Sequence, residues 1–216
     1  MKTTKKVLVV VDVQNDFLPG GPLAVLEGDQ VIPAIQKLME DIDFDQIVMT
    51  QDWHPADHIS FAANNGKQPF EAIETDYGTQ VMWPTHCVQG TKGAEIADGI
   101  DTTKADLIVR KGMNPKADSY SAVYEANGTP TAYEGQVRQL LEDGNVEVYF
   151  TGLATDYCVN FTIQGFLKIA KEVDPRNLHK IRLLLVENAV RGIDLAGIEA
   201  VKKELDRQGV ELVHKL

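Results

Sequence analysis

One cysteine lies where a strand-like segment of the chain gives way to a helical one. Cys158 ends the string Thr151-Gly-Leu-Ala-Thr-Asp-Tyr-Cys158, after an apolar run and at the start of an amphipathic pattern. The backbone N–H groups and the partial positive charge at a helix N-terminus favour thiolate over thiol and can hold an oxyanion. Cys158 is therefore a candidate nucleophile, although a free cysteine after a strand is more often buried and inert.

An aspartate and a lysine stand at the ends of two other apolar runs. Asp12 interrupts a run of valines, and Lys111 closely follows Leu107-Ile-Val109. A buried carboxylate needs a charge partner or hydrogen bonds, and an ordinary salt bridge with Lys111 is the structural alternative. As a functional set, Asp12 would take the thiol proton, while Lys111 would hold the carboxylate and the developing charge.

A further group of side chains could bind a metal ion. Asp52-Trp-His54 and the later His86 supply one carboxylate and two imidazoles. Such a mixed set suits Zn, Fe or Mn and leaves positions open for water or substrate. Surface histidines in a polar loop would show the same spacing. His58 is either a fourth ligand or, with Asp57, part of a turn or helix cap, and the sequence leaves that choice open.

These residues follow apolar runs that alternate with amphipathic stretches. The runs read as strands buried on both faces, at 7–13, 46–50, 107–109, 146–150, 181–186 and 210–213. The amphipathic stretches read as helices, at 29–41, 133–143, 156–172 and 194–208. The alternation predicts an α/β fold with a parallel sheet covered by helices on both faces. In such a sheet the candidate residues, which follow the carboxyl ends of strands, converge on one edge.

One long connection departs from this alternation. From 51 to about 104 the chain is rich in Trp, His, Pro, Asn, Gly and Asp, with short helical patterns only near 59–63 and 94–98. A connection of that length inside a compact domain is usually functional. Because the sequence shows no repeat, low-complexity tract or linker, we expect a single domain over 1–216 with a metal-site insertion at about 52–104.

Composition limits the classes of partner. The chain has a formal charge of −11 and a pI near 4.9, which argues against a nucleic-acid or anionic-membrane surface. Two cysteines are too few for a disulfide framework and fit a reducing compartment. The N-terminus lacks the pattern of a signal peptide, and no run approaches the roughly 20 apolar residues of a membrane span. We predict a cytoplasmic protein without nucleic-acid or membrane partners, and leave a homo-oligomer open.

Five strings together resemble the nicotinamidases of the isochorismatase-like hydrolase superfamily, in the family's order and over most of the chain. The strings are Asp12-Val-Gln-Asn-Asp-Phe17, Asp52-Trp-His-Pro-Ala-Asp-His-Ile-Ser-Phe61, Trp83-Pro-Thr-His-Cys-Val-Gln-Gly90, Lys111-Gly112 and Gly152-Leu-Ala-Thr-Asp-Tyr-Cys158. The resemblance implies a three-layer α/β/α sandwich with a six-stranded, mostly parallel sheet. It also implies the site residues: a catalytic triad of Asp12, Lys111 and Cys158, and one divalent metal ion, Zn or else Fe or Mn, on Asp52, His54 and His86.

Further roles rest on the resemblance alone. The Leu153–Ala154 bond matches the family's non-proline cis peptide, which would aim the N–H groups of Ala154 and Cys158 at the substrate oxygen as an oxyanion hole. The aromatic side chains that match positions around a flat ring are Phe17, Trp83 and Tyr120. Stacking on a ring is a physical reason for aromatic residues there, although they would also serve as plain core residues.

The resemblance implies hydrolysis of nicotinamide to nicotinate and ammonia through a cysteine thioester, in NAD salvage, with pyrazinamide as a second substrate. One alternative is a related amidohydrolase that acts on a carbamoyl or ureido substrate. Another is a metal-binding module without catalytic activity, because a fold does not establish a function. A thiol redox protein is a further alternative, but Cys87 and Cys158 lack Cys-x-x-Cys spacing.

Overall fold

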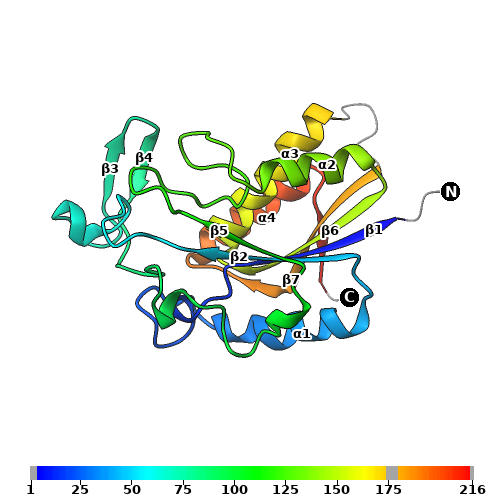
Figure 1. Cartoon of the computed structure of the whole chain (residues 1–216), viewed down its shortest axis with the longest axis horizontal. Coiled ribbons are helices and arrows are strands. Elements are labelled where there is room, and N and C mark those ends of the chain that lie inside the picture. Colours follow the sequence, from blue (N-terminus) through cyan, green and yellow to red (C-terminus); the bar gives the residue numbers. More distant parts are fainter. Residues whose placement is uncertain (1–3, 174–179, 215–216) are drawn as a thin grey trace.

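The computed structural model describes residues 4–173 and 180–214, and its central element is a six-stranded sheet (Figure 1). The strand order is β5-β2-β1-β6-β7-β8, and each described pairing in this sheet is parallel. The strands are β1 (Lys5–Val11), β2 (Gln46–Asp52), β5 (Leu107–Lys111), β6 (Val146–Leu153), β7 (Ile181–Arg191) and β8 (Glu211–Val213). The predicted six-stranded parallel sheet is therefore confirmed.

Helices cover both faces of this sheet because its strands are apolar on both sides. In β1, Val7 and Val9 pack into one core cluster, whereas Leu8 and Val10 pack into the other. The helices are α1 (Val31–Asp41), α2 (Glu134–Asp143), α3 (Asn160–Val173) and α4 (Leu195–Arg207). In Figure 1, α1 lies against one face and the other three helices lie on the opposite face, which gives the predicted three-layer sandwich.

The chain reverses its direction of travel across the sheet between β1 and β6. From β1 it proceeds outward through β2 to β5, and it then returns to place β6 on the other side of β1. A crevice for ligands forms beyond the carboxyl ends of the strands at such a reversal. Asp12 follows β1 at this point, and Cys158 lies soon after the end of β6.

Several element boundaries differ from the sequence-based expectation. β1 ends at Val11 instead of residue 13, because Asp12 takes a left-handed φ of +47° that turns the chain out of the strand. β7 continues to Arg191, past residue 186, and remains paired with the end of β6 through an irregularity in register. The residues predicted as the start of a helix at 156 form a π-helical turn, Thr155–Val159, ahead of α3.

The long connection between β2 and β5 contains a hairpin that the sequence analysis did not predict. Its strands, β3 (Ala72–Thr75) and β4 (Gly78–Val81), pair antiparallel outside the main sheet. The helical pattern predicted near 59–63 is a 3₁₀ turn at Ala62–Asn65. The pattern predicted near 94–98 is not a helix, since only a 3₁₀ turn at Lys92–Ala94 precedes it. Polar residues and glycines give this region turns instead of helices.

The predicted absence of a leader and of a membrane span involves the N-terminus, of which residues 1–3 lie outside the described residues. Across 4–173 and 180–214, none of the helices has the length and apolar character needed to cross a bilayer. The assignment to the cytoplasm stays a prediction.

The close approach of β1 and β6 depends on a glycine. Gly152 has a φ of +104°, and a Cβ at this position would lie 2.0 Å from the carbonyl oxygen of Val11. We expect Gly152→Ala to lower the free energy of unfolding by more than about 2 kcal/mol, because the two backbones must move apart. Unfolding in urea, monitored by circular dichroism, measures this loss.

The matched control is Gly135→Ala in α2, where an added Cβ meets open space. The same substitution there should be neutral or should stabilise the protein by up to about 1 kcal/mol, because alanine favours helix. Equal stability of the Gly152→Ala protein and the unaltered protein would contradict the described contact between β1 and β6.

Candidate active site

The structure brings the candidate nucleophile, base and lysine together at the reversal between β1 and β6. Asp12 follows β1, Lys111 is the last residue of β5, and Cys158 lies in the π-helical turn after β6. All three are buried. One carboxylate oxygen of Asp12, one carboxylate oxygen of Asp52 and Sγ of Cys158 all lie within 4.8 Å of one another. Residues far apart in sequence therefore share one small buried volume.

The Lys111 ammonium connects these groups. Its Nζ lies 2.8 Å from Asp12 Oδ2 and 2.5 Å from Asp52 Oδ1. It also lies 3.4 Å from Cys158 Sγ and donates to the carbonyl oxygen of Ser119 at 3.0 Å. The arrangement is more than the ordinary salt bridge considered from the sequence, because the same ammonium also reaches the thiol.

Asp12 is fixed in place by its neighbour on β2. The Thr50 hydroxyl donates to Asp12 Oδ1 at 2.5 Å and accepts from the Asp12 backbone N–H at 3.1 Å. Burial raises the pKa of Asp12, and Lys111 opposes the shift. A carboxylate with a raised pKa accepts a proton more readily than an exposed one, as a general base must. The sequence analysis missed Thr50, although a polar residue near the end of a buried strand was a usable signal.

Burial of Cys158 opposes the effect expected of the helix N-terminus, which favours thiolate. Burial raises the pKa of the Cys158 thiol well above its usual value, and the neighbouring carboxylates add to the shift although Lys111 opposes it. Burial would lower the pKa of Lys111, but Asp12 and Asp52 outweigh it and raise that pKa. A thiol with a raised pKa needs a base to remove its proton before the sulfur attacks.

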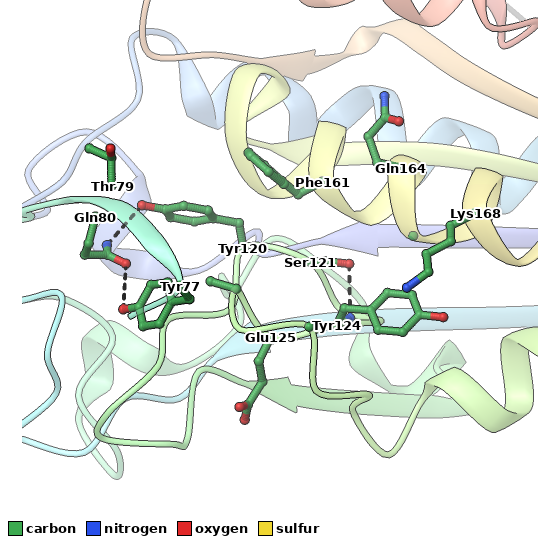
Figure 2. A pocket seen from close by; sticks show the side chains of 13 residues that line it. Tyr77, Thr79, Gln80, Tyr120, Ser121, Tyr124, Glu125, Phe161, Gln164 and Lys168 are labelled. Atoms are coloured by element: carbon green, nitrogen blue, oxygen red, sulfur yellow. Dashed lines mark hydrogen bonds between the residues drawn. The ribbon is translucent and has the colours of Figure 1, made fainter. Parts of the chain in front are cut away.

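Aromatic side chains expected around a flat ring gather beside these groups. The Trp83 Nε1–H donates to Tyr120 Oη at 2.9 Å, and the ring of Phe17 lies 5.5 Å from that of His86. Tyr157, which directly precedes Cys158, places its ring 4.9 Å from that of Trp83. The sequence analysis missed Tyr157, even though its position next to the nucleophile was a signal. Tyr120 also lines a pocket of about 390 Å³ (Figure 2).

The Leu153–Ala154 peptide bond is cis, as the resemblance implied. It joins the end of β6 to the π-helical turn that carries Cys158. The use of the Ala154 and Cys158 N–H groups as an oxyanion hole stays a prediction.

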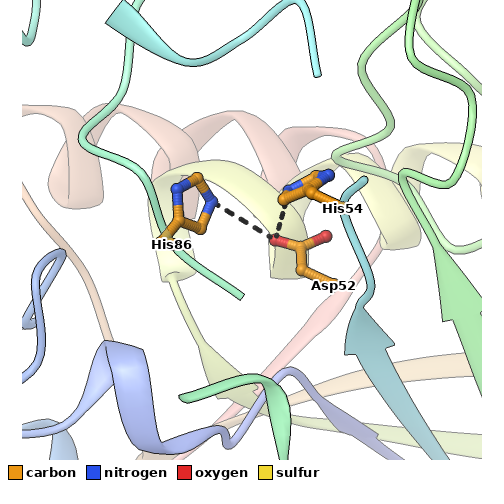
Figure 3. A group of neighbouring side chains, drawn as sticks. All are labelled: Asp52, His54 and His86. Atoms are coloured by element: carbon orange, nitrogen blue, oxygen red, sulfur yellow. Dashed lines mark ion pairs between the residues drawn. The ribbon is translucent and has the colours of Figure 1, made fainter. Parts of the chain in front are cut away.

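Three candidate metal ligands face one another (Figure 3). Nε2 of His54 and Nε2 of His86 lie 3.7 and 4.0 Å from Asp52 Oδ2. Nδ1 of His54 lies 2.8 Å from the carbonyl oxygen of Gly112, and Nδ1 of His86 lies 2.7 Å from that of Pro84. A carbonyl only accepts, so Nδ1 carries the proton in each ring and each Nε2 has a lone pair for a cation.

The protonation states and the backbone also fit a cation. Burial, together with His54, lowers the pKa of His86 to about 4, so this ring is neutral near pH 7. Asp52 raises the pKa of His54 despite burial, so a proton competes with metal for that nitrogen. Gly112 has a φ of +64°, and a Cβ there would lie 2.4 Å from the His54 ring. Any residue other than glycine at position 112 would therefore clash with the His54 ring.

His58 lies against this group, with its ring centroid 4.2 Å from that of His54. Its Nδ1 accepts from the Ser60 backbone N–H at 3.3 Å and contacts the Ser60 hydroxyl at 2.7 Å. Its Nε2 is buried without a hydrogen-bond partner. The His58 ring also lies near Asp118, a residue that was not predicted from the sequence. If Nδ1 accepts from Ser60, Nε2 carries the proton in the neutral ring; if Nδ1 donates to the Ser60 hydroxyl, Nε2 keeps a lone pair and His58 could bind a metal.

Comparisons with known proteins identify a family and several relatives. The isochorismatase domain family matches residues 6–170. The nicotinamidase of Acinetobacter baylyi is 54% identical over 157 residues, which cover 72% of this chain and 71% of that protein. The yeast nicotinamidase structure is 33% identical, with a TM-score of 0.83, and the match covers 97% of this chain and 100% of the other.

A further solved structure is that of the pyrazinamidase of Pyrococcus horikoshii in complex with zinc. It is 33% identical, with a TM-score of 0.71, and the match covers 98% of this chain and 99% of that one. The fold, the extent of the family match and the identity to these relatives lead to one conclusion: the chain belongs to the isochorismatase domain family.

Proposed function

We propose that the protein is a nicotinamidase, an amidohydrolase that converts nicotinamide to nicotinate and ammonia. The observation that carries the proposal is the contact of Cys158 Sγ with the Lys111 ammonium, which also binds Asp12, next to three converging metal donors. The names of the relatives support the choice of amide. Pyrazinamide is a second expected substrate, because it also carries a carboxamide on a flat nitrogen-containing ring.

In the proposed first half-reaction, Asp12 takes the proton of the Cys158 thiol as the sulfur attacks the carboxamide carbon. The new C–S bond forms as the C=O π electrons move to oxygen, and the backbone N–H groups of Ala154 and Cys158 are proposed to bind that oxyanion. When the carbonyl re-forms, the C–N bond breaks and the proton held by Asp12 goes to the leaving nitrogen. Ammonia departs and a thioester on Cys158 remains.

In the second half-reaction a water replaces the amine. Asp12 takes a proton from the water as its oxygen attacks the thioester carbon, and the C–S bond breaks. That proton returns to the departing sulfur, so Asp12 and Cys158 recover their starting states. Lys111 keeps its charge throughout, holds Asp12 in reach and offsets the negative charge that develops on sulfur.

The aromatic side chains and the metal donors are assigned to the substrate ring. Phe17, Trp83 and Tyr120 are proposed to enclose the pyridine ring, which limits its orientations before attack. Asp52, His54 and His86 are proposed to hold one divalent ion, with Zn, Fe or Mn matching the donor set. Such an ion would polarise the ring nitrogen or a water molecule when bound.

We also assign the protein to the cytoplasm. Cys87 and Cys158 are both free thiols, which fits a reducing compartment.

An ammonia-release assay on nicotinamide, pyrazinamide, benzamide and N-carbamoyl amines tests the proposed reaction. Release from nicotinamide and pyrazinamide, with little from the carbamoyl compounds, is the expected result. Faster release from a carbamoyl or ureido compound would identify the related amidohydrolase instead.

Replacing the nucleophile or its base should stop turnover while the fold remains. We expect Cys158→Ala and Asp12→Asn each to lower kcat for nicotinamide by at least about a thousandfold, because residues that act as a unit lose most of their effect together. Steady-state ammonia release measures kcat, and circular dichroism checks the fold. The control is Cys87→Ala at the other buried cysteine, which should retain activity. Turnover near the unaltered rate in Cys158→Ala would refute the assignment of the nucleophile.

Removing one imidazole should reduce metal binding. We expect His54→Ala to lower the metal content of the purified protein sharply, because two remaining ligands bind a divalent ion weakly. Elemental analysis of proteins purified in parallel measures the content. The control is His214→Ala at an exposed histidine paired with Glu187, which should leave the content unchanged. His58→Ala tests the fourth position, and a fall in content there would make His58 a ligand.

The same His54→Ala protein also tests whether the metal contacts the ring nitrogen of the substrate. Its affinity for nicotinamide should fall much more than its affinity for benzamide, which has no ring nitrogen. Competition binding of the two amides measures both affinities. Unchanged metal content would refute the ligand assignment, and equal losses for the two amides would refute the proposed contact with the ring nitrogen.

A further inference from the structure

Gln80 is a buried side chain on a largely exposed hairpin. Its exposed fraction is 1%, whereas the two residues before it in β4 are exposed and the next is half-buried. A polar amide without hydrogen-bond partners is costly to bury. The hydrogen bonds of Gln80 therefore show what the hairpin is attached to.

The Gln80 amide contacts four groups, of which Tyr77 and Tyr120 are drawn in Figure 2. Its Nε2 lies 2.8 Å from Asp118 Oδ2, 2.8 Å from the carbonyl oxygen of Val81 and 3.2 Å from Tyr120 Oη. Its Oε1 accepts from the Tyr77 hydroxyl at 3.1 Å. The carbonyl oxygen of Val81 and Oδ2 of Asp118 accept from this group at the two shortest distances, so the two NH₂ hydrogens face these oxygens and the 3.2 Å contact with Tyr120 Oη is a shared one. The orientation of the amide is thus set by the chemistry of its neighbours.

Tyr120 receives a second donor from Trp83, three residues after Gln80. The Trp83 Nε1–H donates to Tyr120 Oη at 2.9 Å, and the two rings are nearly perpendicular. Both rings also contact Tyr157, the residue before Cys158. Trp83 thus donates directly to this phenol oxygen, and the Gln80 NH₂ makes a longer, shared contact with it at 3.2 Å.

Tyr120 also lines a pocket, so its ring has open space beside it. The pocket has a volume of about 390 Å³, and its lining includes Tyr77, Gln80, Tyr120 and Phe161. A ring that borders open space can rotate into it unless hydrogen bonds oppose the movement. Without the Gln80 amide, Tyr120 keeps only the Trp83 donor of the pair, and Asp118 loses one of its partners.

We propose that Gln80 is a positioning residue that holds Tyr120 and Trp83 in place around the substrate ring. The inference rests on the proposed function, because the importance of the two rings comes from the amide that they enclose. Gln80 acts through Tyr120 and not on the reacting atoms. Its loss should therefore weaken binding of the substrate more than it slows the chemical steps.

Steady-state kinetics of Gln80→Met test this proposal, because methionine is similar in length and lacks the donors. We expect KM for nicotinamide to rise by about tenfold, with kcat changed by less than about threefold. The control is Tyr77→Phe, which removes the hydroxyl that donates to Gln80 Oε1 and leaves both Gln80 donors intact. KM should change by less than about twofold in this control. An unchanged KM in a folded Gln80→Met protein, or a loss confined to kcat, would overturn the proposal.

A second readout does not depend on activity. Trp83 is 4% exposed, and a Trp53→Phe background leaves it as the single tryptophan of the chain. Acrylamide should quench Trp83 fluorescence more strongly after Gln80→Met than before it, because the restraint on the pair of rings is weaker. Equal quenching would overturn the proposal. Lack of ammonia release from nicotinamide by the unaltered protein would instead refute the proposed function, and the quenching experiment would still test the restraint.

If Gln80→Met does not fold, the proposal can be tested by exchanging the amide and carboxyl groups of Gln80 and Asp118. Gln80→Glu places two carboxylates together and should raise KM. Adding Asp118→Asn restores a donor to face the new carboxylate, so the double variant should recover part of the loss. Metal content, measured in both proteins, shows whether Asp118→Asn disturbs the nearby histidines. Failure of the double variant to improve on Gln80→Glu, at equal metal content, would overturn the proposal.

Discussion

The buried ammonium of Lys111 is the interaction on which the site depends. It lies between the carboxylates of Asp12 and Asp52, all three in the interior. Burying one of these charges alone would be prohibitive, and the group is tolerated because each charge has a partner. Two carboxylates and one ammonium leave one negative charge in excess. That excess opposes ionisation of Cys158 and favours a cation near Asp52, so the thiol chemistry and the metal donors are linked through one lysine.

The order of the strands makes this interaction possible. Asp12, Asp52 and Lys111 lie at the ends of three adjacent parallel strands, β1, β2 and β5, so they meet at one edge of the sheet. Cys158 follows β6, which lies on the other side of β1, across the reversal of strand order. Because β1 is covered by core residues on both faces, it has little freedom to move, and the distances among these groups are fixed by the sheet.

The sequence predicted the parts that follow simple periodicity. Apolar runs of strand length marked the sheet, and the polar residues after them, such as Asp12 and Lys111, marked the site because parallel strands end together. Contacts between distant loops had no such signal. Nothing in the sequence indicates that Gln80 bonds Asp118, or that Gly112 and Pro84 direct the imidazole nitrogens of His54 and His86. Burial also opposes a local expectation: the helix terminus favours thiolate at Cys158, whereas desolvation of that thiol raises its pKa.

The proposed mechanism depends on a covalent thioester between Cys158 and the substrate. The direct measurement is mass spectrometry of the protein after rapid acid quenching during turnover of nicotinamide, followed by proteolysis. We expect an added nicotinoyl group on the peptide that contains Cys158, present during turnover and lost once the substrate is consumed. An adduct on a different residue, or ammonia release with no adduct at any quench time and no burst of ammonia, would contradict it.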